Sequence, residues 1–411
     1  MMGIRTSRPL SSLSTRLDTL TIFRNILSDP VVSKLKKLLW LANEREDLRE
    51  AISAYGDFVA SLYEVTPNLS DYIAKILVED ENFYIRRKAA GKHISPSVEA
   101  SIREEILLLE EICALTSDAV KIALGYDGFL PSWDNAGYCG LHDKYAEKLS
   151  NLSQTGYGVF AKYTTFVVED RRLEPVKYPD RQKLEELYGY EREKNLVIRN
   201  TEALLSGEGA SNVLLYGDAG TGKSSTIKAI ANRYASKGLR LVEIKKNQLY
   251  ELPAIIEELS ENPLSFILFI DDLSFSKNDD NFSALKAILE GSVSVSGDNM
   301  AIYATSNRRH LLKETSSQRE GDEIHLSDTL QETMSLAARF GLTVTFQKPD
   351  RDSYLDIVDA LAVQYGLVPE GSDPSRQEDL HRKAEAHAIR TGGRTPRTAK
   401  QFIELQKIGI V

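Results

Sequence analysis

The sequence has little cysteine and little histidine. Its 411 residues include two cysteines, Cys113 and Cys139, and six histidines. Two cysteines are too few for a disulfide framework, and neither residue type shows the spacing of a metal site. The simplest interpretation is a protein of a reducing compartment, and we expect it in the cytoplasm.

Long apolar runs are also missing. A membrane helix needs about 18 continuous apolar residues, whereas the longest comparable run here, LSFILFI at 264–270, has the length of a strand. The sequence therefore predicts no membrane span. Its first 17 residues contain Arg5, Arg8 and Arg16 and no acidic residue. Transit peptides share this composition, but a loose polar arm is the interpretation that we favour.

Positive charge is not in excess. The chain has 51 Lys and Arg residues against 60 Asp and Glu residues, a formal net charge of −9. This balance argues against a general nucleic-acid coat but leaves a local basic groove open. Two short basic segments could serve such a groove, namely Arg308-Arg309 and the group Lys34, Lys36 and Lys37.

Apolar periodicity divides the chain into four segments. Residues 1–157 show apolar residues at three- and four-residue spacing, which predicts a helical N-terminal domain. Aromatic residues at this spacing usually belong to a core, and we expect core positions for Trp40, Tyr55, Phe58, Tyr63 and Trp133. Residues 158–183 change to a β-rich composition and predict a short hairpin and linker, with its turn near Asp170.

The rest of the chain predicts an α/β domain followed by helices. Residues 184–349 contain five short apolar runs separated by helical patterns, which is typical of a doubly wound parallel sheet of five strands. Residues 350–411 contain only helical patterns and predict a small helical lid domain.

A phosphate-binding loop follows the first of these strands. The stretch YGDAGTGKSS has the spacing of a P-loop, with a strand before it and a helix after it. Its backbone N–H groups would cradle phosphates, Lys223 would reach the β and γ phosphates, and the Ser224 hydroxyl would bind Mg²⁺. The candidate loop residues are Gly217, Asp218, Ala219, Gly220, Thr221, Gly222, Lys223, Ser224 and Ser225.

Polar residues end two later strands. Asp271 and Asp272 follow FILFI, and Asn307 follows MAIYATS. The carboxyl ends of the strands face the ligand crevice in such sheets. We therefore expect Asp271 to hold the Mg²⁺ shell, Asp272 to deprotonate the attacking water, and Asn307 to bind the γ-phosphate or that water. The alternative for each is an ordinary turn residue.

Two arginines complete an ordered set of motifs. Arg339 ends a helix in ARFG, and Arg397 begins a helix in TPR; either could be an exposed helix-terminal cation. With the P-loop, the Asp-Asp pair and ATSN, however, the set resembles an AAA+ ATPase over residues 185–411. The resemblance implies that Asn307 is sensor 1, Arg339 the arginine finger and Arg397 sensor 2.

A narrower similarity is to an uncharacterised bacterial family of AAA+ ATP-binding proteins, through LYGYER, FIDDLSF and AIYATSNRRHL. The AAA+ resemblance implies that the LYGYER segment packs on adenine, so Leu187, Gly189 and Tyr190 are candidates for the base. Asp272 departs from the Glu of most AAA+ proteins and matches the initiator and helicase-loader branch. No N-K-x-D stretch for guanine follows, which favours ATP over GTP.

These motifs predict an ATP-hydrolysing protein whose conformational changes act on an unknown protein partner through the N-terminal domain. The resemblance implies a homo-oligomer with shared active sites. Two alternatives stay open: a nucleotide-gated adaptor with negligible turnover, and a helicase-loader-like ATPase that associates with DNA. A small-molecule kinase is a weaker alternative, because a kinase has no use for an arginine in a separate helical lid.

Overall fold

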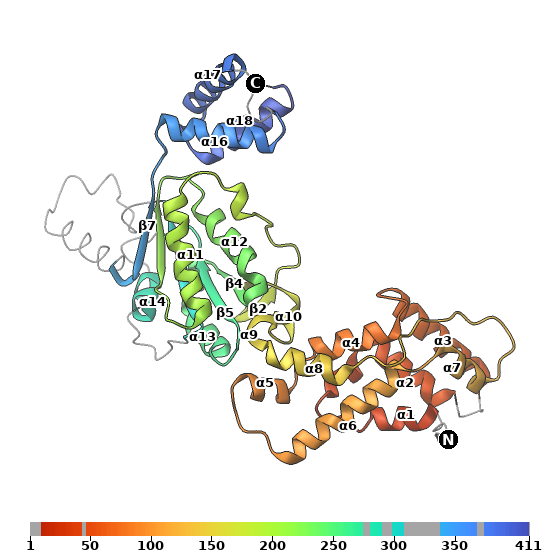
Figure 1. Ribbon diagram of the computed structural model, residues 1–411. Helices are drawn as coiled ribbons and strands as arrows, with labels where there is room; N and C mark the ends of the chain where they lie inside the picture. The colour runs from red at the N-terminus through yellow and green to blue at the C-terminus, as the bar shows by residue number, and fades with distance from the viewer. Residues whose placement is uncertain are drawn as a thin grey trace. The chain divides into compact units, whose positions relative to one another are not determined.

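The structure is a computed structural model that describes residues 10–42, 47–273, 280–289, 298–307, 338–367 and 374–410 (Figure 1). The contacts within the chain define two compact units, Met1–Lys162 and Tyr163–Val411.

The first unit is built from helices. Local capping sets several of their ends: Asp29 accepts the N–H groups of Val31 and Val32 at the start of α2, and Asn68 does the same for Ser70 and Asp71 at the start of α4. The helices are α1 (Leu10–Leu17), α2 (Pro30–Leu41), α3 (Leu48–Tyr63), α4 (Leu69–Glu79), α5 (Phe83–Ala89), α6 (Pro96–Cys113), α7 (Ser117–Leu124), α8 (Leu141–Ser150), α9 (Leu152–Thr155) and α10 (Val159–Lys162), with a short 3₁₀ turn at Arg24–Ser28.

The aromatic residues of this unit divide between core and surface. Tyr55, Phe58 and Trp133 are buried against one another, and the Trp133 indole donates to the carbonyl of Leu115 at 3.0 Å. The expectation of a core position was wrong for Trp40 and Tyr63, which are 46% and 47% exposed. Both lie at the last turn of their helices, where spacing alone does not settle which face is covered.

The second unit contains a sheet of seven strands in the order β2-β1-β4-β5-β6-β3-β7. The five predicted strands are parallel, a sixth strand, β1, adds to them in parallel, and β2 pairs antiparallel with β1 at the edge. The strands are β1 (Thr165–Glu169), β2 (Arg172–Pro175), β3 (Val213–Gly217), β4 (Leu239–Ile244), β5 (Ser265–Ile270), β6 (Met300–Ser306) and β7 (Leu342–Phe346).

The two additional strands are the hairpin around Asp170. Asp170 and Arg171 both have positive φ, 48° and 62°, as a two-residue type I′ turn requires. Instead of forming a separate linker, β1 pairs in parallel with β4, with Thr165 opposite Leu241. The hairpin was correctly expected, but its place in the sheet was not, because the pairing partner lies far along the chain.

Helices cover the sheet and form the lid. α11 (Glu191–Ser206) and α12 (Lys223–Tyr234) pack Val197 and Ile227 against Val213 and Leu215 of β3. The remaining helices of the sheet domain are α13 (Leu252–Ser260) and α14 (Asp280–Leu289), with 3₁₀ turns at Leu184–Glu186, Ala235–Lys237 and Lys246–Glu251.

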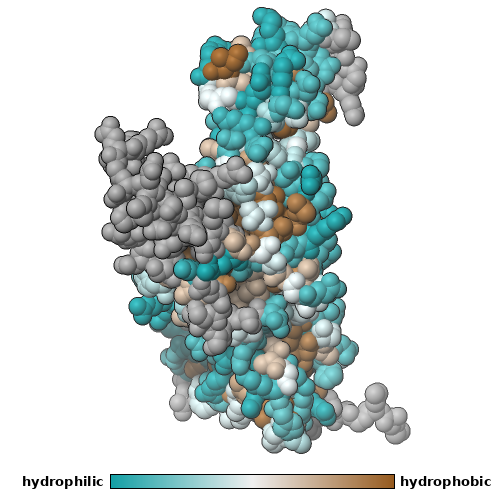
Figure 2. Space-filling model, turned by 90° about the vertical axis from the view of Figure 1, so that its left-hand side faces the viewer, coloured by the Kyte–Doolittle hydropathy of each residue, from teal (hydrophilic) through white to brown (hydrophobic). Residues whose placement is uncertain are grey.

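The predicted C-terminal helices are α16 (Arg351–Gln364), α17 (Pro374–Thr391) and α18 (Pro396–Lys407), which share a small core around Tyr354 and Phe402. Figure 2 shows the visible face of this lid as mostly hydrophilic. In the part of the chain that the structure describes, no helix combines the length and apolar character that crossing a membrane requires.

Candidate functional site

The loop between β3 and α12 depends on glycine. Gly217 has φ 136°, and a Cβ built on it would lie 2.0 Å from the carbonyl oxygen of Phe346 on β7. Gly222, with φ 91°, precedes the first residue of α12, Lys223. The helix therefore begins directly beneath the loop, where its free N–H groups and positive end favour an anion.

Replacing Gly217 by Ala should destabilise the second unit by about 2–4 kcal/mol, because the new methyl group meets the backbone of β7. Gly209→Ala is the matched control. Gly209 also has positive φ, 83°, but no atom lies within 4 Å of its Cβ position, so it should cost only about 1–2 kcal/mol. Chemical unfolding of both variants measures the difference, and equal losses would show that the clash is relieved by movement of β7.

Strand order brings the polar strand ends together. β6 lies between β5, which ends before Asp271, and β3, which leads to Lys223. Asn307, just beyond β6, bridges the two: the Lys223 ammonium donates to Asn307 Oδ1 at 3.0 Å, and Asn307 Nδ2 donates to Asp272 Oδ1 at 2.8 Å. The predicted residues thus form one hydrogen-bonded chain at the carboxyl edge of the sheet.

The Lys223 ammonium has no anionic partner in direct contact among the described residues. Its other acceptors are the carbonyl oxygens of Gly217 and Asp218, at 3.1 and 2.7 Å. The residue is 6% exposed, and burial is the main cause of a lowered pKa for its ammonium group. A buried cation held only by neutral oxygens favours the approach of an anion.

The Asp271 carboxylate accepts hydrogen bonds from two hydroxyl groups. Ser224 Oγ donates to Asp271 Oδ1 at 2.6 Å, and Thr305 Oγ1 donates to the same oxygen. This set of oxygen donors has the chemistry that Mg²⁺ prefers, with phosphate oxygens and water supplying the remaining ligands. Asp272, next along the chain, has φ 51°, a conformation that few residues other than Gly, Asn and Asp adopt.

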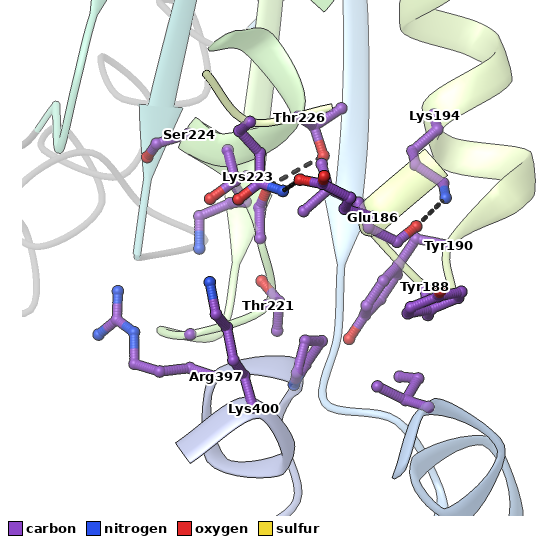
Figure 3. A pocket seen from close by; sticks show the side chains of 18 of the residues that line it. Glu186, Tyr188, Tyr190, Lys194, Thr221, Lys223, Ser224, Thr226, Arg397 and Lys400 are labelled. Atoms are coloured by element: carbon purple, nitrogen blue, oxygen red, sulfur yellow. Dashed lines mark hydrogen bonds between the residues drawn. The ribbon is translucent and has the colours of Figure 1, made fainter. Parts of the chain in front are cut away.

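A cavity of about 750 Å³ connects these groups with the lid, a volume within the usual range for ligand pockets. Leu187, Gly189 and Tyr190 line it, together with Ile357 and Tyr365 of the lid. Figure 3 shows Tyr188 and Tyr190 on one side and Arg397 and Lys400 rising from α18 toward the loop. The predicted residues that line it are Leu187, Gly189, Tyr190, Ala219, Gly220, Thr221, Gly222, Lys223, Ser224, Ser225, Asp271, Asp272, Asn307 and Arg397.

The LYGYER segment is held by both the sheet domain and the lid. Tyr190 has φ 59°, its hydroxyl donates to the carbonyl of Gln347 at 2.6 Å, and its ring lies 5.1 Å from that of Phe346. A Cβ on Gly189 would lie 3.0 Å from Ile357 Cδ1. A movement of the lid would therefore change the shape of this wall of the cavity.

Several cavity residues lack a sequence signal of their own. Lys194, 6% exposed, donates to the carbonyl of Leu187 at 2.5 Å, and Glu186 and Tyr188 also line the cavity. Lys400 of α18 lines it beside Arg397. For Lys400 a signal does exist in hindsight, because it lies three residues after Arg397 and so on the same face of the predicted helix.

Three predicted residues lie outside the cavity wall. The Asp218 carboxylate turns away and accepts the N–H of Lys348 at 2.9 Å, and Gly217 contributes only the backbone beneath the loop. Arg339 precedes β7 at the amino end of that strand, whereas the P-loop follows the carboxyl end of the neighbouring β3. Arg308, Arg309 and Glu323, a further candidate for the general base, lie outside the described residues.

Comparison with known proteins identifies the family of this chain. The family described as "Protein of unknown function (DUF815)" matches residues 160–408, more than half of the sequence. The chain belongs to this family. Its second unit has the predicted arrangement of a mainly parallel sheet with a glycine-rich loop between β3 and α12, and two strands are added to the sheet. No protein with a curated description matches.

Solved structures show a distant likeness. PCH-2 of C. elegans is 18% identical with a TM-score of 0.39, and the match covers 55% of this chain and 66% of that one. RuvB of Thermotoga maritima is 18% identical with a TM-score of 0.36, and the match covers 55% of this chain and 66% of that one. The replication initiator DnaA bound to AMPPCP and single-stranded DNA is 15% identical with a TM-score of 0.38, and the match covers 57% of this chain and 67% of that one. The chain thus spans about two thirds of the length of these proteins.

Proposed function

We propose that the protein binds ATP with Mg²⁺ in this cavity and hydrolyses it to drive conformational change. The observation that carries the proposal is the chain Lys223–Asn307–Asp272, with Ser224 and Asp271 beside it, at the foot of a cavity of nucleotide size. A cation, a neutral amide and a carboxylate in hydrogen-bond contact are the groups that phosphoryl transfer to water requires.

Each residue then has a distinct role. Lys223 and the loop N–H groups bind the β and γ phosphates in place of the carbonyl contacts that Lys223 now makes. Ser224 and Asp271 would hold Mg²⁺, which supplies positive charge to the phosphates. Asp272 accepts the proton of the attacking water, and Asn307 keeps the Asp272 carboxylate oriented through its 2.8 Å hydrogen bond.

The far wall suits a nucleobase. Leu187, Tyr188, Ile357 and Tyr365 give this end of the cavity apolar and aromatic surface, on which a flat base stacks well. Because the lid contributes two of these residues, base binding and lid position are linked. The preference for adenine over guanine is supported only by the lack of an N-K-x-D stretch.

Arg397 and Arg339 would transmit the conformational change to the lid and to a neighbouring subunit. Arg397 lines the cavity from the lid, so phosphate binding would draw α18 inward. Arg339 would act on a neighbouring subunit in a homo-oligomer, and the helical first unit would recognise a protein partner. Loss of the γ-phosphate would release both contacts.

Lys223→Ala should lower ATP affinity by about 10-fold or more, because the buried triphosphate loses its charge compensation. Lys228→Ala is the matched control: it removes a lysine from the same helix, but Lys228 pairs with Glu243 at 2.8 Å and does not line the cavity. Calorimetric titration with Mg-ATP, with thermal unfolding as a check of folding, measures the effect. A folded Lys223→Ala protein with unchanged ATP affinity would contradict the proposed binding of ATP at this loop.

The adaptor alternative rests on Asp272. Its carboxylate is one methylene shorter than the Glu of most AAA+ proteins, and Asn307 already occupies one of its oxygens. A protein with this site could bind ATP as a switch and turn over very slowly. Steady-state ATPase assays of the wild-type protein, alone and with candidate partners, separate the two functions.

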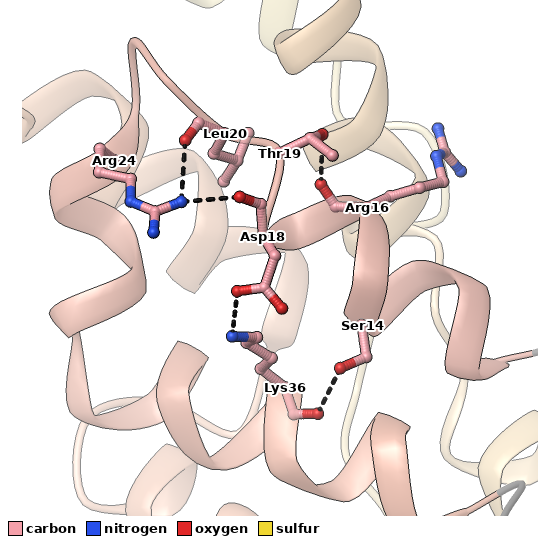
Figure 4. A network of polar contacts seen from close by, with 7 residues as sticks. All are labelled: Ser14, Arg16, Asp18, Thr19, Leu20, Arg24 and Lys36. Atoms are coloured by element: carbon pink, nitrogen blue, oxygen red, sulfur yellow. Dashed lines mark hydrogen bonds and ion pairs between the residues drawn. The ribbon is translucent and has the colours of Figure 1, made fainter.

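A DNA-associated role receives less support from the first unit. Lys36 pairs with Asp18, as Figure 4 shows, Lys37 pairs with Glu50 at 3.1 Å, and Lys34 donates to Ser61 at 3.0 Å. These three lysines therefore have partners within their own unit, and the other basic segment, Arg308-Arg309, lies outside the described residues.

A further inference from the structure

The first turn of α18 lies directly on the phosphate-binding loop. The N–H of Arg397 donates to the carbonyl oxygen of Gly220 at 3.2 Å. A Cβ on Gly220 would lie 3.1 Å from Thr395 Oγ1 and 3.3 Å from Arg397 Cβ. A larger residue at this position, where φ is 80°, would be strained and would press on these side chains, so the start of α18 has a defined position above the loop.

Lys400 extends from the same face of the helix as Arg397. Residues three apart are neighbours on a helix surface, while Phe402 and Ile403 on the other face are buried in the lid core. Both cationic side chains line the cavity, and Figure 3 shows Lys400 pointing toward the loop that carries Thr221 and Lys223. Lys400 therefore enters the phosphate end of the cavity.

Charge at this end is unbalanced. Among the described residues, none accepts a hydrogen bond from or forms an ion pair with the Lys400 side chain. Burial is the main cause of the lowered pKa of Lys223; the carboxylates of Asp218, Asp271 and Asp272 act against it, and the Arg397 guanidinium acts with it. Asp271 and Asp272 are already bonded to Ser224, Thr305 and Asn307. Five cations line the cavity, Lys194, Lys223, Arg397, Lys400 and Lys407, against the three carboxylates of Glu186, Asp271 and Asp272. The excess is positive, and a polyphosphate is a ligand whose charge would offset it.

We propose that Lys400 is a second lid residue that binds the phosphate chain of the nucleotide, beside Arg397. This inference rests on the proposed ATP-binding function and adds a residue that the AAA+ motifs do not include. The ammonium group makes a point-charge contact with non-bridging phosphate oxygens. Because Arg397 and Lys400 belong to one helix, the lid closes more firmly over a triphosphate than over a nucleoside without phosphates.

Lys400→Gln in the full-length protein should lower Mg-ATP affinity by about 5–10-fold, as expected for loss of one charge-assisted contact. It should leave adenosine affinity unchanged, because adenosine uses only the base end. Lys400→Arg should retain most of the ATP affinity. The matched control is Lys383→Gln, in α17 of the same lid, which pairs with Asp379 at 3.3 Å and does not line the cavity; its effect on ATP should be less than about 2-fold.

The outcomes separate this inference from the proposed function. ATP binding by the wild-type protein with no loss in Lys400→Gln, or with equal losses in Lys400→Gln and Lys383→Gln, would overturn the role of Lys400 alone. An equal loss of ATP and adenosine affinity would do the same, because it would indicate a general effect on the lid. No ATP binding by the wild-type protein would overturn both.

Discussion

Asp272→Asn should hold ATP at nearly wild-type affinity and hydrolyse it about 100-fold more slowly or worse, the usual scale for loss of a general base. The substitution disturbs little else. Asn adopts the φ of 51° found at this position at least as readily as Asp, and its Oδ1 can still accept the Asn307 amide that now lies 2.8 Å away. What disappears is the ability to take a proton.

Single-turnover hydrolysis and a parallel binding titration measure this separation. Asp356→Asn is the control, since it removes an exposed carboxylate of α16 that does not line the cavity. Wild-type turnover in Asp272→Asn would move the base to another residue, with Asp271 and Glu323 as the next to test. A wild-type protein that binds ATP without measurable turnover would favour the adaptor instead.

The carboxyl edge of the sheet was the most predictable part of the molecule. Parallel strands end at the same edge, so Lys223, Asp271 and Asn307 had to converge if the five apolar runs formed one sheet. The order of those strands adds what spacing cannot: β6 lies between β3 and β5, which explains why Asn307 contacts both Lys223 and Asp272.

The parts that escaped prediction depend on packing between distant segments. Ile357 and Tyr365 reach the cavity only because the lid closes over it, and nothing in their own helical pattern distinguishes them from core residues. Thr305 is in register to contact Asp271 because β5 and β6 are neighbours. The hairpin shows the same limit, because its turn is local while its pairing with β4 is not.

Arg339 poses a different question, because its geometry argues against a role in its own site. Leu342, the first residue of β7, pairs with Val213, the first residue of β3, and the P-loop begins after the last residue of β3. Five strand residues span about 16 Å, so Arg339 and Lys223 lie toward opposite ends of these two neighbouring strands. A role for Arg339 in catalysis therefore requires the site of a second copy of the chain.

Arg339→Ala should bind ATP normally and lose hydrolysis by about 1000-fold, because an arginine finger meets charge that develops only during transfer. An arginine with a merely structural role would give a smaller loss, accompanied by lower thermal stability; Arg376→Ala, an exposed arginine of α17 outside the cavity, provides the baseline.

Mixing Arg339→Ala with Asp272→Asn tests whether the site is shared. An Arg339→Ala subunit keeps Asp272 and can receive Arg339 from an Asp272→Asn neighbour, so some interfaces combine both intact residues. In an equimolar mixture with free subunit exchange, about a quarter of the interfaces should do so in a ring of any size, and activity should recover to that fraction of the wild-type value. Exchange is followed by fluorescence transfer between labelled subunits. If the subunits exchange and the mixture stays as inactive as either parent, Arg339 does not complete a neighbouring site.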